Sequence, residues 1–320
     1  MRSWVPACLA CLLFIPFLQA RAETECRVIN LMPEFWRVWE ASAGLPEDER
    51  AAKFMQEFVT RHAEIYQPDI LAPARSEVSL SSLSREFVSK AVAVVPQMRK
   101  LSAQLQEDLP DYLARFRKAF PSFRCEFSIY FLPSLGMFDG AGRNIEGRVA
   151  LLFGVDEIAR IYENADLGAF FTHELFHRYH AQVGGEGAGG RSSLYQSLWE
   201  EGLATYVSHV LNPGVSESVV LGRPPDLAER ARPMLPKLAA ELLENFDSTS
   251  AEEYAAFFYG RRQRGEVPPR SGYYVGYLVA WKAARGRNLD QLAHLKGDPL
   301  RREIRAQLTE LAKGNAPQER

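Results

Sequence analysis

Two histidines spaced four residues apart, His173 and His177, are the side chains of this sequence best arranged for metal chemistry. Positions i and i+4 of an α-helix lie one above the other on the same face, so both imidazoles can reach one ion without distorting the backbone. Glu174 completes an H-E-x-x-H motif, in which the carboxylate projects beside the ion and acts on a bound water. The motif indicates a zinc-dependent hydrolytic site, but so short a string also arises by chance, and the segments around it must decide.

The residues around the motif are typical of a helix. Residues 166–180 contain no proline, and Asn164 and Asp166 are both suitable N-caps. An apolar stripe at positions i, i+4 and i+8 is formed by Phe171, Leu175 and Tyr179. The glycine-rich run at 184–190 should end the helix, either as a loop beside the site or as a plain linker.

A zinc site of this kind needs a third protein ligand, and a second predicted helix at residues 192–212 offers one. Glu201 follows His177 after 23 intervening residues, enough for the end of one helix, a loop and the start of the next. Gly202 comes directly after it, and a small residue there would let the second helix approach the first closely. Glu200 is the alternative ligand, because adjacent helical positions differ by about 100° and the sequence does not fix the register.

Two further histidines are weaker ligand candidates. His180 would lie a full turn beyond His177, about 5 Å along the helix axis, which suits a shared tetrahedral site poorly. His209 lies two turns beyond Glu201 and is interpreted as a packing or surface residue. The longer pattern H-E-x-x-H-x-x-G-x-x-H is absent, because positions 180 and 183 are histidine and valine. The sequence therefore favours His173, His177 and Glu201 as the ligand set.

The H-E-x-x-H motif and the string Glu200-Glu201-Gly202-Leu203-Ala204 together resemble the thermolysin-like zinc peptidases called gluzincins. The aminopeptidase branch of that superfamily carries Asn-Glu-Gly-Phe-Ala at its third ligand, which here matches Glu201. Glutamate replaces the asparagine and the spacer is longer, so the layout is more similar to bacterial proteins described only as zinc-dependent proteases. The resemblance covers residues 145–285, approximately, and is specific at its two motifs.

The resemblance implies an α+β fold that is predominantly helical, with a zincin-like core, a small sheet preceding the motif helix and a helical C-terminal part. It also implies Zn²⁺ as the cofactor and a peptide or protein as the substrate, which pairs through its backbone with the edge strand of the sheet. Residues 148–154 would form that strand. Glu174 would act as general base, taking a proton from the attacking water and delivering it to the leaving amine.

A late tyrosine-rich segment at residues 271–281 is the candidate source of a hydrogen-bond donor for the oxyanion. In the resembling superfamily this donor is a tyrosine or histidine on a later helix. Tyr273 is the first choice and Tyr274 the second, while Tyr277 shares a face with Tyr273 at i+4. Gly276 would permit close approach of another helix. The alternative for each tyrosine is a place in an aromatic packing stripe.

The N-terminus reads as a secretory signal peptide over residues 1–22. Arg2 precedes an apolar run at 4–18, and an A-x-A cleavage pattern follows at 20–22. Prolines within the run, and its length of about fifteen residues, argue against a retained membrane span. The protein is therefore expected to be exported, to the periplasm or the medium of a bacterium.

Export has consequences for cysteine and charge. Cys26 and Cys125 remain after signal removal and are predicted to form one disulfide, the alternative being two buried thiols. Residues 1–22 contain Arg2 and Arg21 and no acidic residue, so their loss changes the formal net charge from −2 to −4. This charge does not indicate nucleic acid or an anionic membrane as a partner.

Three regions are expected: the signal peptide at 1–22, an N-terminal helical region at 23–120 that packs on the core and, as the resemblance implies, a zincin-like metallopeptidase domain at 121–320. Helices are expected at 82–93 and 98–120, with breaks at Pro96 and Pro110. Strands are expected at 126–132 and 148–155.

Three hypotheses follow from these observations. The first is a zinc-dependent peptidase of the gluzincin type. The second is a catalytically silent binding or scaffold protein that kept the fold, which the intact Glu174 disfavours. The third is a zinc amidohydrolase acting on a non-peptide amide, such as a cell-wall component. The sequence does not distinguish endopeptidase from exopeptidase action and does not indicate an oligomeric state.

Overall fold

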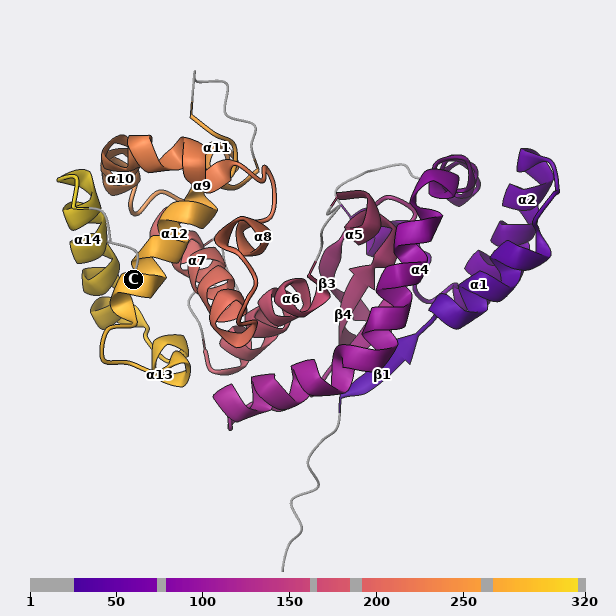
Figure 1. Ribbon diagram of the computed structural model, residues 1–320, viewed down its shortest axis with the longest axis horizontal. Helices are drawn as coiled ribbons and strands as arrows, with labels where there is room; N and C mark the ends of the chain where they lie inside the picture. The colour runs from indigo at the N-terminus through magenta and orange to yellow at the C-terminus, as the bar shows by residue number, and fades with distance from the viewer. Residues whose placement is uncertain (1–25, 74–78, 162–165, 185–191, 260–266, 316–320) are drawn as a thin grey trace, which may run out of the picture.

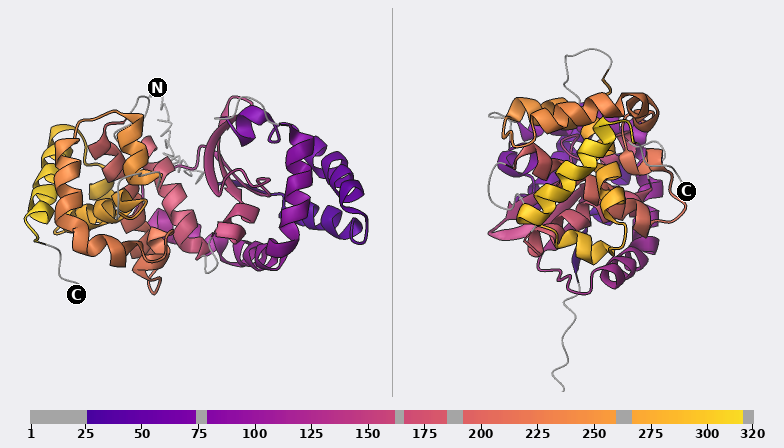
Figure 2. Two further views of the ribbon diagram at one scale, coloured as in Figure 1. Left: turned by 90° about the horizontal axis from the view of Figure 1, so that it is seen from above. Right: turned by 90° about the vertical axis from the view of Figure 1, so that its left-hand side faces the viewer.

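Helices dominate the fold, and one four-stranded sheet accompanies them (Figure 1). The computed structural model describes residues 26–73, 79–161, 166–184, 192–259 and 267–315. The predicted α+β class with a predominance of helix is thus confirmed. The N-terminal helices and the sheet lie on one side of the molecule and the C-terminal helices on the other, as Figure 2 shows. The motif helix α6 (Leu167–Gln182) lies between them.

The sheet has the strand order β1-β2-β4-β3. Its members are β1 (Arg27–Asn30), β2 (Ser128–Leu132), β3 (Gly140–Ile145) and β4 (Arg148–Gly154). The first two pairs are parallel, and β3 runs antiparallel to β4. The last five residues of β4 are buried, as expected for an apolar run in the interior of a sheet.

The prediction that residues 148–154 form the edge strand is wrong. β4 lies between β2 and β3, so the edge on the side of the motif helix is β3. β3 was not predicted, because Gly140 and Gly142 depress its strand signal. β1, a four-residue strand from the region predicted to be helical, was not predicted either.

The longest element is α4 (Leu80–Ala119), a single helix of 40 residues that contains Pro96 and Pro110. The expected breaks at these prolines are therefore wrong. A proline inside a helix removes one hydrogen bond and bends the axis, and packing can hold the helix together across the bend. Figure 1 shows α4 changing direction along its length.

The short helices before α4 pack against it through aromatic side chains that belong to the hydrophobic core. Phe35, Phe54, Phe58 and Phe87 contact one another with ring centroids 5.2–6.0 Å apart. They lie on α1 (Met32–Ala41), α2 (Glu47–Phe54), its continuation Met55–Val59 and α4. The other short elements of this region are Thr60–His62 and α3 (Pro68–Leu71). In Figure 1, α1 and α2 lie at the far end of the molecule from the C-terminal helices, with the sheet between them and the motif helix.

The C-terminal helices surround one close helix pair, α7 (Leu194–Leu211) and α12 (Ser271–Ala283). A Cβ atom added at Gly202 of α7 would lie 2.1 Å from the backbone carbon of Gly276 in α12. Gly202 therefore serves contact with α12, not the expected contact with α6. The remaining helices are α5 (Val155–Ile161), α8 (Glu217–Leu221), α9 (Leu227–Ala231) with Arg232–Met234, α10 (Leu235–Glu244), α11 (Ala251–Phe258), α13 (Leu289–Ala293) and α14 (Gly297–Ala312).

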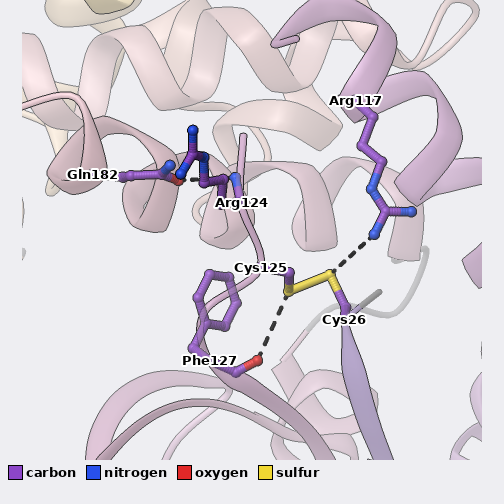
Figure 3. The surroundings of a disulfide bond; sticks show 6 residues. All are labelled: Cys26, Arg117, Arg124, Cys125, Phe127 and Gln182. Carbon is purple, nitrogen blue, oxygen red and sulfur yellow. Dashed lines mark hydrogen bonds between the residues drawn. A yellow bond between two sulfur atoms is a disulfide. The ribbon is translucent and has the colours of Figure 1, made fainter. Parts of the chain in front are cut away.

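The predicted disulfide is present and joins Cys26 to Cys125, so that the segments leading into β1 and β2 are covalently linked (Figure 3). Beside it, the backbone N–H of Arg124 donates to Oε1 of Gln182 in α6 at 3.1 Å. The predicted signal peptide lies outside the described residues. Within the described ranges, no helix has both the length and the apolar character that crossing a membrane requires.

Candidate metal centre

Three side chains from two neighbouring helices converge on one point. His173 and His177 come from α6, and Glu201 comes from α7, which packs against α6. The two Nε2 atoms lie 3.1 Å apart, and Oε2 of Glu201 lies 3.4 Å from Nε2 of His173 and 3.6 Å from that of His177. In the described part of the chain, this is the one group of His, Cys, Asp and Glu side chains close enough to hold a metal ion.

The distances within this group fit a tetrahedral ion. In a tetrahedron the ligand–ligand edge is about 1.6 times the metal–ligand distance, so Zn–N and Zn–O bonds of about 2.0–2.1 Å give edges of about 3.3–3.4 Å. The three observed separations, 3.1, 3.4 and 3.6 Å, bracket that value. Two imidazoles and one carboxylate also match the donor set of catalytic zinc sites that keep a position open.

Local sequence explains how α6 presents the histidines. The Asp166 side chain accepts a hydrogen bond from the backbone N–H of Ala169 and so caps the helix, one of the two predicted N-caps. The other, Asn164, lies outside the described residues, as does most of the glycine-rich run after the helix. The predicted apolar stripe is fully buried and fixes the rotation of α6, so the histidines face the opposite side.

The charges of the three groups support one another. Burial disfavours the charged form of His177, but Glu201 outweighs that effect and raises the pKa of His177 to about 9. Burial likewise disfavours the Glu201 carboxylate, and the two histidines nevertheless hold its pKa well below the usual range. A metal ion must displace the imidazole proton, so binding at this site releases a proton and becomes tighter as the pH rises.

Glu174 lies beside the ligand group, and β3 passes directly over it. A Cβ atom added at Gly140 would lie 2.8 Å from Cδ of Glu174 and 3.0 Å from its Oε1. The chain at this point is fixed by Asp139, whose carboxylate accepts the N–H of Gly140 and whose carbonyl accepts the N–H of Gly154, both at 2.8 Å. Burial raises the pKa of Glu174, which suits a carboxylate that must take up a proton.

The ligand group and Glu174 open onto a cavity of about 750 Å³ between the two sides of the molecule. The wall on the side of the sheet includes Asp139 and Gly140, and the opposite wall includes Tyr254 and Tyr273. Apolar side chains on the rest of the lining are Ile161, Phe170, Val219, Val220, Leu221 and Phe258. Its volume lies within the range of about 300–1,000 Å³ that is usual for ligand-binding pockets.

The three candidate tyrosines have different surroundings. Tyr273 lines the cavity, with its ring centroid 6.4 Å from that of His173, and burial raises its pKa well above the ordinary value. Tyr274 is buried, and its hydroxyl accepts a hydrogen bond from Arg232 at 3.3 Å. The Tyr277 hydroxyl is 2.8 Å from Nδ1 of His209, away from the cavity. The structure thus brings Tyr273 alone of the three to the ligand group.

The alternative ligands lie apart from the group. Glu200 lines a separate cavity of about 320 Å³ next to α11. His180 is buried, with its ring stacked on Phe176 at 5.4 Å. Gly140 and Asp139 are the site residues that the sequence analysis missed, because no local pattern marks a strand that crosses a helix.

A comparison of the chain with protein-family models, curated proteins and solved structures found no match. The resemblance to the thermolysin-like peptidases therefore consists of two short motifs. In space, the glutamate of the second motif lies within 3.6 Å of both imidazoles of the first.

Proposed function

We propose that the protein is a zinc-dependent peptidase with a zincin-like core. The observation that carries the proposal is the meeting of His173, His177 and Glu201 at tetrahedral spacing, with Glu174 beside them in an open cavity. These three side chains would hold Zn²⁺, which would supply Lewis-acid chemistry and make water a stronger acid, with a pKa of about 7.

Glu174 would move the proton. Its carboxylate would take a proton from the attacking water and deliver it to the nitrogen of the leaving amine. Burial raises the pKa of Glu174, which favours its protonated form between these two transfers. The Tyr273 hydroxyl would donate a hydrogen bond to the oxyanion. Burial raises its pKa, so this hydroxyl keeps its proton at neutral pH and remains a donor.

The outer edge of β3 is the proposed docking edge for the substrate backbone. β3 is the outer strand of the sheet, and its first residue, Gly140, lies against the Glu174 carboxylate. An extended peptide that adds to this edge would place a backbone carbonyl next to the general base. This role replaces the one expected for residues 148–154, which pair on both sides.

We also propose that the protein is exported from a bacterial cell. The disulfide between Cys26 and Cys125 supports this, because such bonds persist in oxidising compartments. The predicted signal peptide would direct that export.

The decisive experiment combines metal analysis with cleavage of a peptide library by the purified protein. We expect one zinc per chain and cleavage that a chelator abolishes. Glu174→Gln should keep the metal and lose turnover, since only the proton acceptor is removed. Full activity of Glu174→Gln on any substrate of the wild type would contradict the mechanism.

A matched pair of neighbouring glutamates tests the ligand assignment. Glu201→Ala should reduce zinc content strongly, whereas Glu200→Ala should leave it unchanged, because Glu200 faces the other cavity. The reverse order would move the ligand by one residue.

A further inference from the structure

An arginine on α6 lies next to the outer strand of the sheet, one helical turn beyond the candidate general base. Arg178 follows Glu174 by four residues, so the two side chains share a face of the helix. A Cβ atom added at Gly142 would lie 3.0 Å from Nη2 and 3.2 Å from Cζ of Arg178, just as one at Gly140 would meet Glu174. The two glycines are two residues apart on β3 and therefore face the same side. β3 thus runs along α6, with one glycine against the carboxylate and the next against the guanidinium.

The guanidinium of Arg178 is held in place without being neutralised. Among the residues that the structure describes, none forms a hydrogen bond or an ion pair with it. Its Nε atom is closed to solvent and has no partner, whereas the residue as a whole is half-buried and the neighbouring Gly142 is exposed. A ligand can therefore reach the two Nη atoms. Buried donors without a partner are rare in folded proteins, and a planar guanidinium in this state is suited to an external anion.

The outer edge of β3 determines which part of a substrate would reach Arg178. A peptide strand added there continues the pleat, so each substrate side chain points to the same face as the β3 residue opposite it. The substrate residue opposite Gly140 would lie next to the general base and flank the cleaved bond. The residue opposite Gly142, two positions further along the substrate, would direct its side chain at the guanidinium. The spacing fits, because two strand residues span about 7 Å and four helical residues about 6 Å.

We infer that Arg178 selects an aspartate or glutamate at the substrate residue opposite Gly142, by binding its carboxylate through the two Nη groups. The inference deepens the proposed peptidase function and rests on it, because the ligand is a peptide paired with β3. Guanidinium and carboxylate are planar and form two parallel hydrogen bonds between charged groups, whereas a glutamine side chain offers one acceptor and no charge. In this role Arg178 determines specificity and does not touch the reacting atoms.

Competition between two kinds of peptide library tests the inference. The octapeptides are acetylated and amidated at their ends, carry one glutamate or one glutamine at a fixed position, and have uncharged residues elsewhere. Both libraries compete for the zinc-loaded wild-type protein, and mass spectrometry of the products gives the cleaved bond and the ratio of kcat/KM for glutamate over glutamine. We expect a ratio of about ten or more at one position, two or three residues from the cleaved bond. At the other positions the ratio should be about one or less, because the cavity lining is otherwise acidic.

Variants connect the preference to the guanidinium. Arg178→Gln should lower the ratio at that position to about one, and Arg178→Lys, which keeps the charge without the planar fork, should retain a reduced ratio. Arg223→Gln is the matched control: Arg223 lines the cavity and is exposed, and the ratio should survive its loss. A purely structural role of Arg178 would change the cleavage of both libraries alike and leave the ratio unchanged.

Two results would overturn the inference and leave the peptidase function standing: a ratio of about one or less at every position in the wild type, or a raised ratio that survives in Arg178→Gln. Loss of the ratio in Arg223→Gln but not in Arg178→Gln would do the same. A wild-type protein that holds zinc and cleaves neither library would refute the peptidase function. Retention of the two libraries on immobilised protein would then decide the inference: a glutamate preference that Arg178→Gln abolishes would support it, and equal or absent retention would overturn it.

Discussion

Two glycines close to the candidate site, Gly202 and Gly140, let different parts of the molecule come close together. At Gly202 an added Cβ would meet backbone atoms of Gly276 on α12, whereas at Gly140 it would meet the carboxyl end of the Glu174 side chain. Backbone cannot move without separating the helices, but a side chain can rotate. The helix contact therefore maintains the fold that carries Glu201, and the strand contact maintains the placement of a reacting group.

Gly202→Ala should have the largest effect, because the added methyl would overlap the backbone carbon at 2.1 Å. We expect a loss of about 3 kcal/mol or more in the free energy of unfolding and reduced zinc content, since separation of α7 displaces Glu201. Denaturant unfolding measures the first and metal analysis the second. Val210→Ala, an exposed change on the same helix, should be nearly neutral. A Gly202→Ala protein as stable as the wild type would show that the α7–α12 contact is loose.

Gly140→Ala should affect catalysis and leave the fold and the metal nearly unchanged. The methyl would push Glu174 from its position, and a displacement of about 1 Å lowers turnover by about 10²-fold. Steady-state kinetics with zinc analysis on the same sample would distinguish this from Gly202→Ala. If Gly140→Ala lost zinc and stability together with activity, the contrast between the two glycines would fail.

The same contrast explains what the sequence could predict. The ligand group was predictable, because His173 and His177 are local to one helix and Glu201 is marked by a short string on the next. Gly140 was not, because its role depends on a strand that crosses α6 and glycine weakens every strand pattern. Pro96 and Pro110 were misread because tertiary packing overrode local propensity.

Tyr273→Phe removes the hydroxyl that α12 contributes to the site and leaves the Glu174 carboxylate next to β3 unchanged. Loss of one oxyanion donor lowers kcat by about 10²-fold and leaves the substrate affinity nearly unchanged, because the hydroxyl acts on charge that develops during the reaction. Tyr274→Phe is the control, since that hydroxyl is bonded to Arg232 and does not line the cavity. Equal effects of the two changes would assign both tyrosines to packing.

The smallest expected effect concerns the loop that leads into β3. Asp156, which is buried, accepts the backbone N–H groups of Ser134 and Gly136 and so holds that loop. Burial raises the pKa of Asp156 to about 6, although its hydrogen bonds lower the pKa in part. The folded protein therefore binds more protons than the unfolded chain between about pH 4 and 6, and its stability falls as the pH rises through that window.

Asp156→Asn removes the titrating group and should remove this part of the pH dependence. The difference in the free energy of unfolding, variant minus wild type, should increase by about 2 kcal/mol from pH 4 to pH 7. Loss of the charged acceptor shifts this difference by the same amount at every pH and does not affect the increase. Denaturant unfolding of both proteins with a chelator present excludes any contribution from metal binding. If the difference in the free energy of unfolding between the two proteins stayed constant from pH 4 to pH 7, the Asp156 carboxylate would be ionised throughout this range. The loop before β3 would then be held by a charged acceptor.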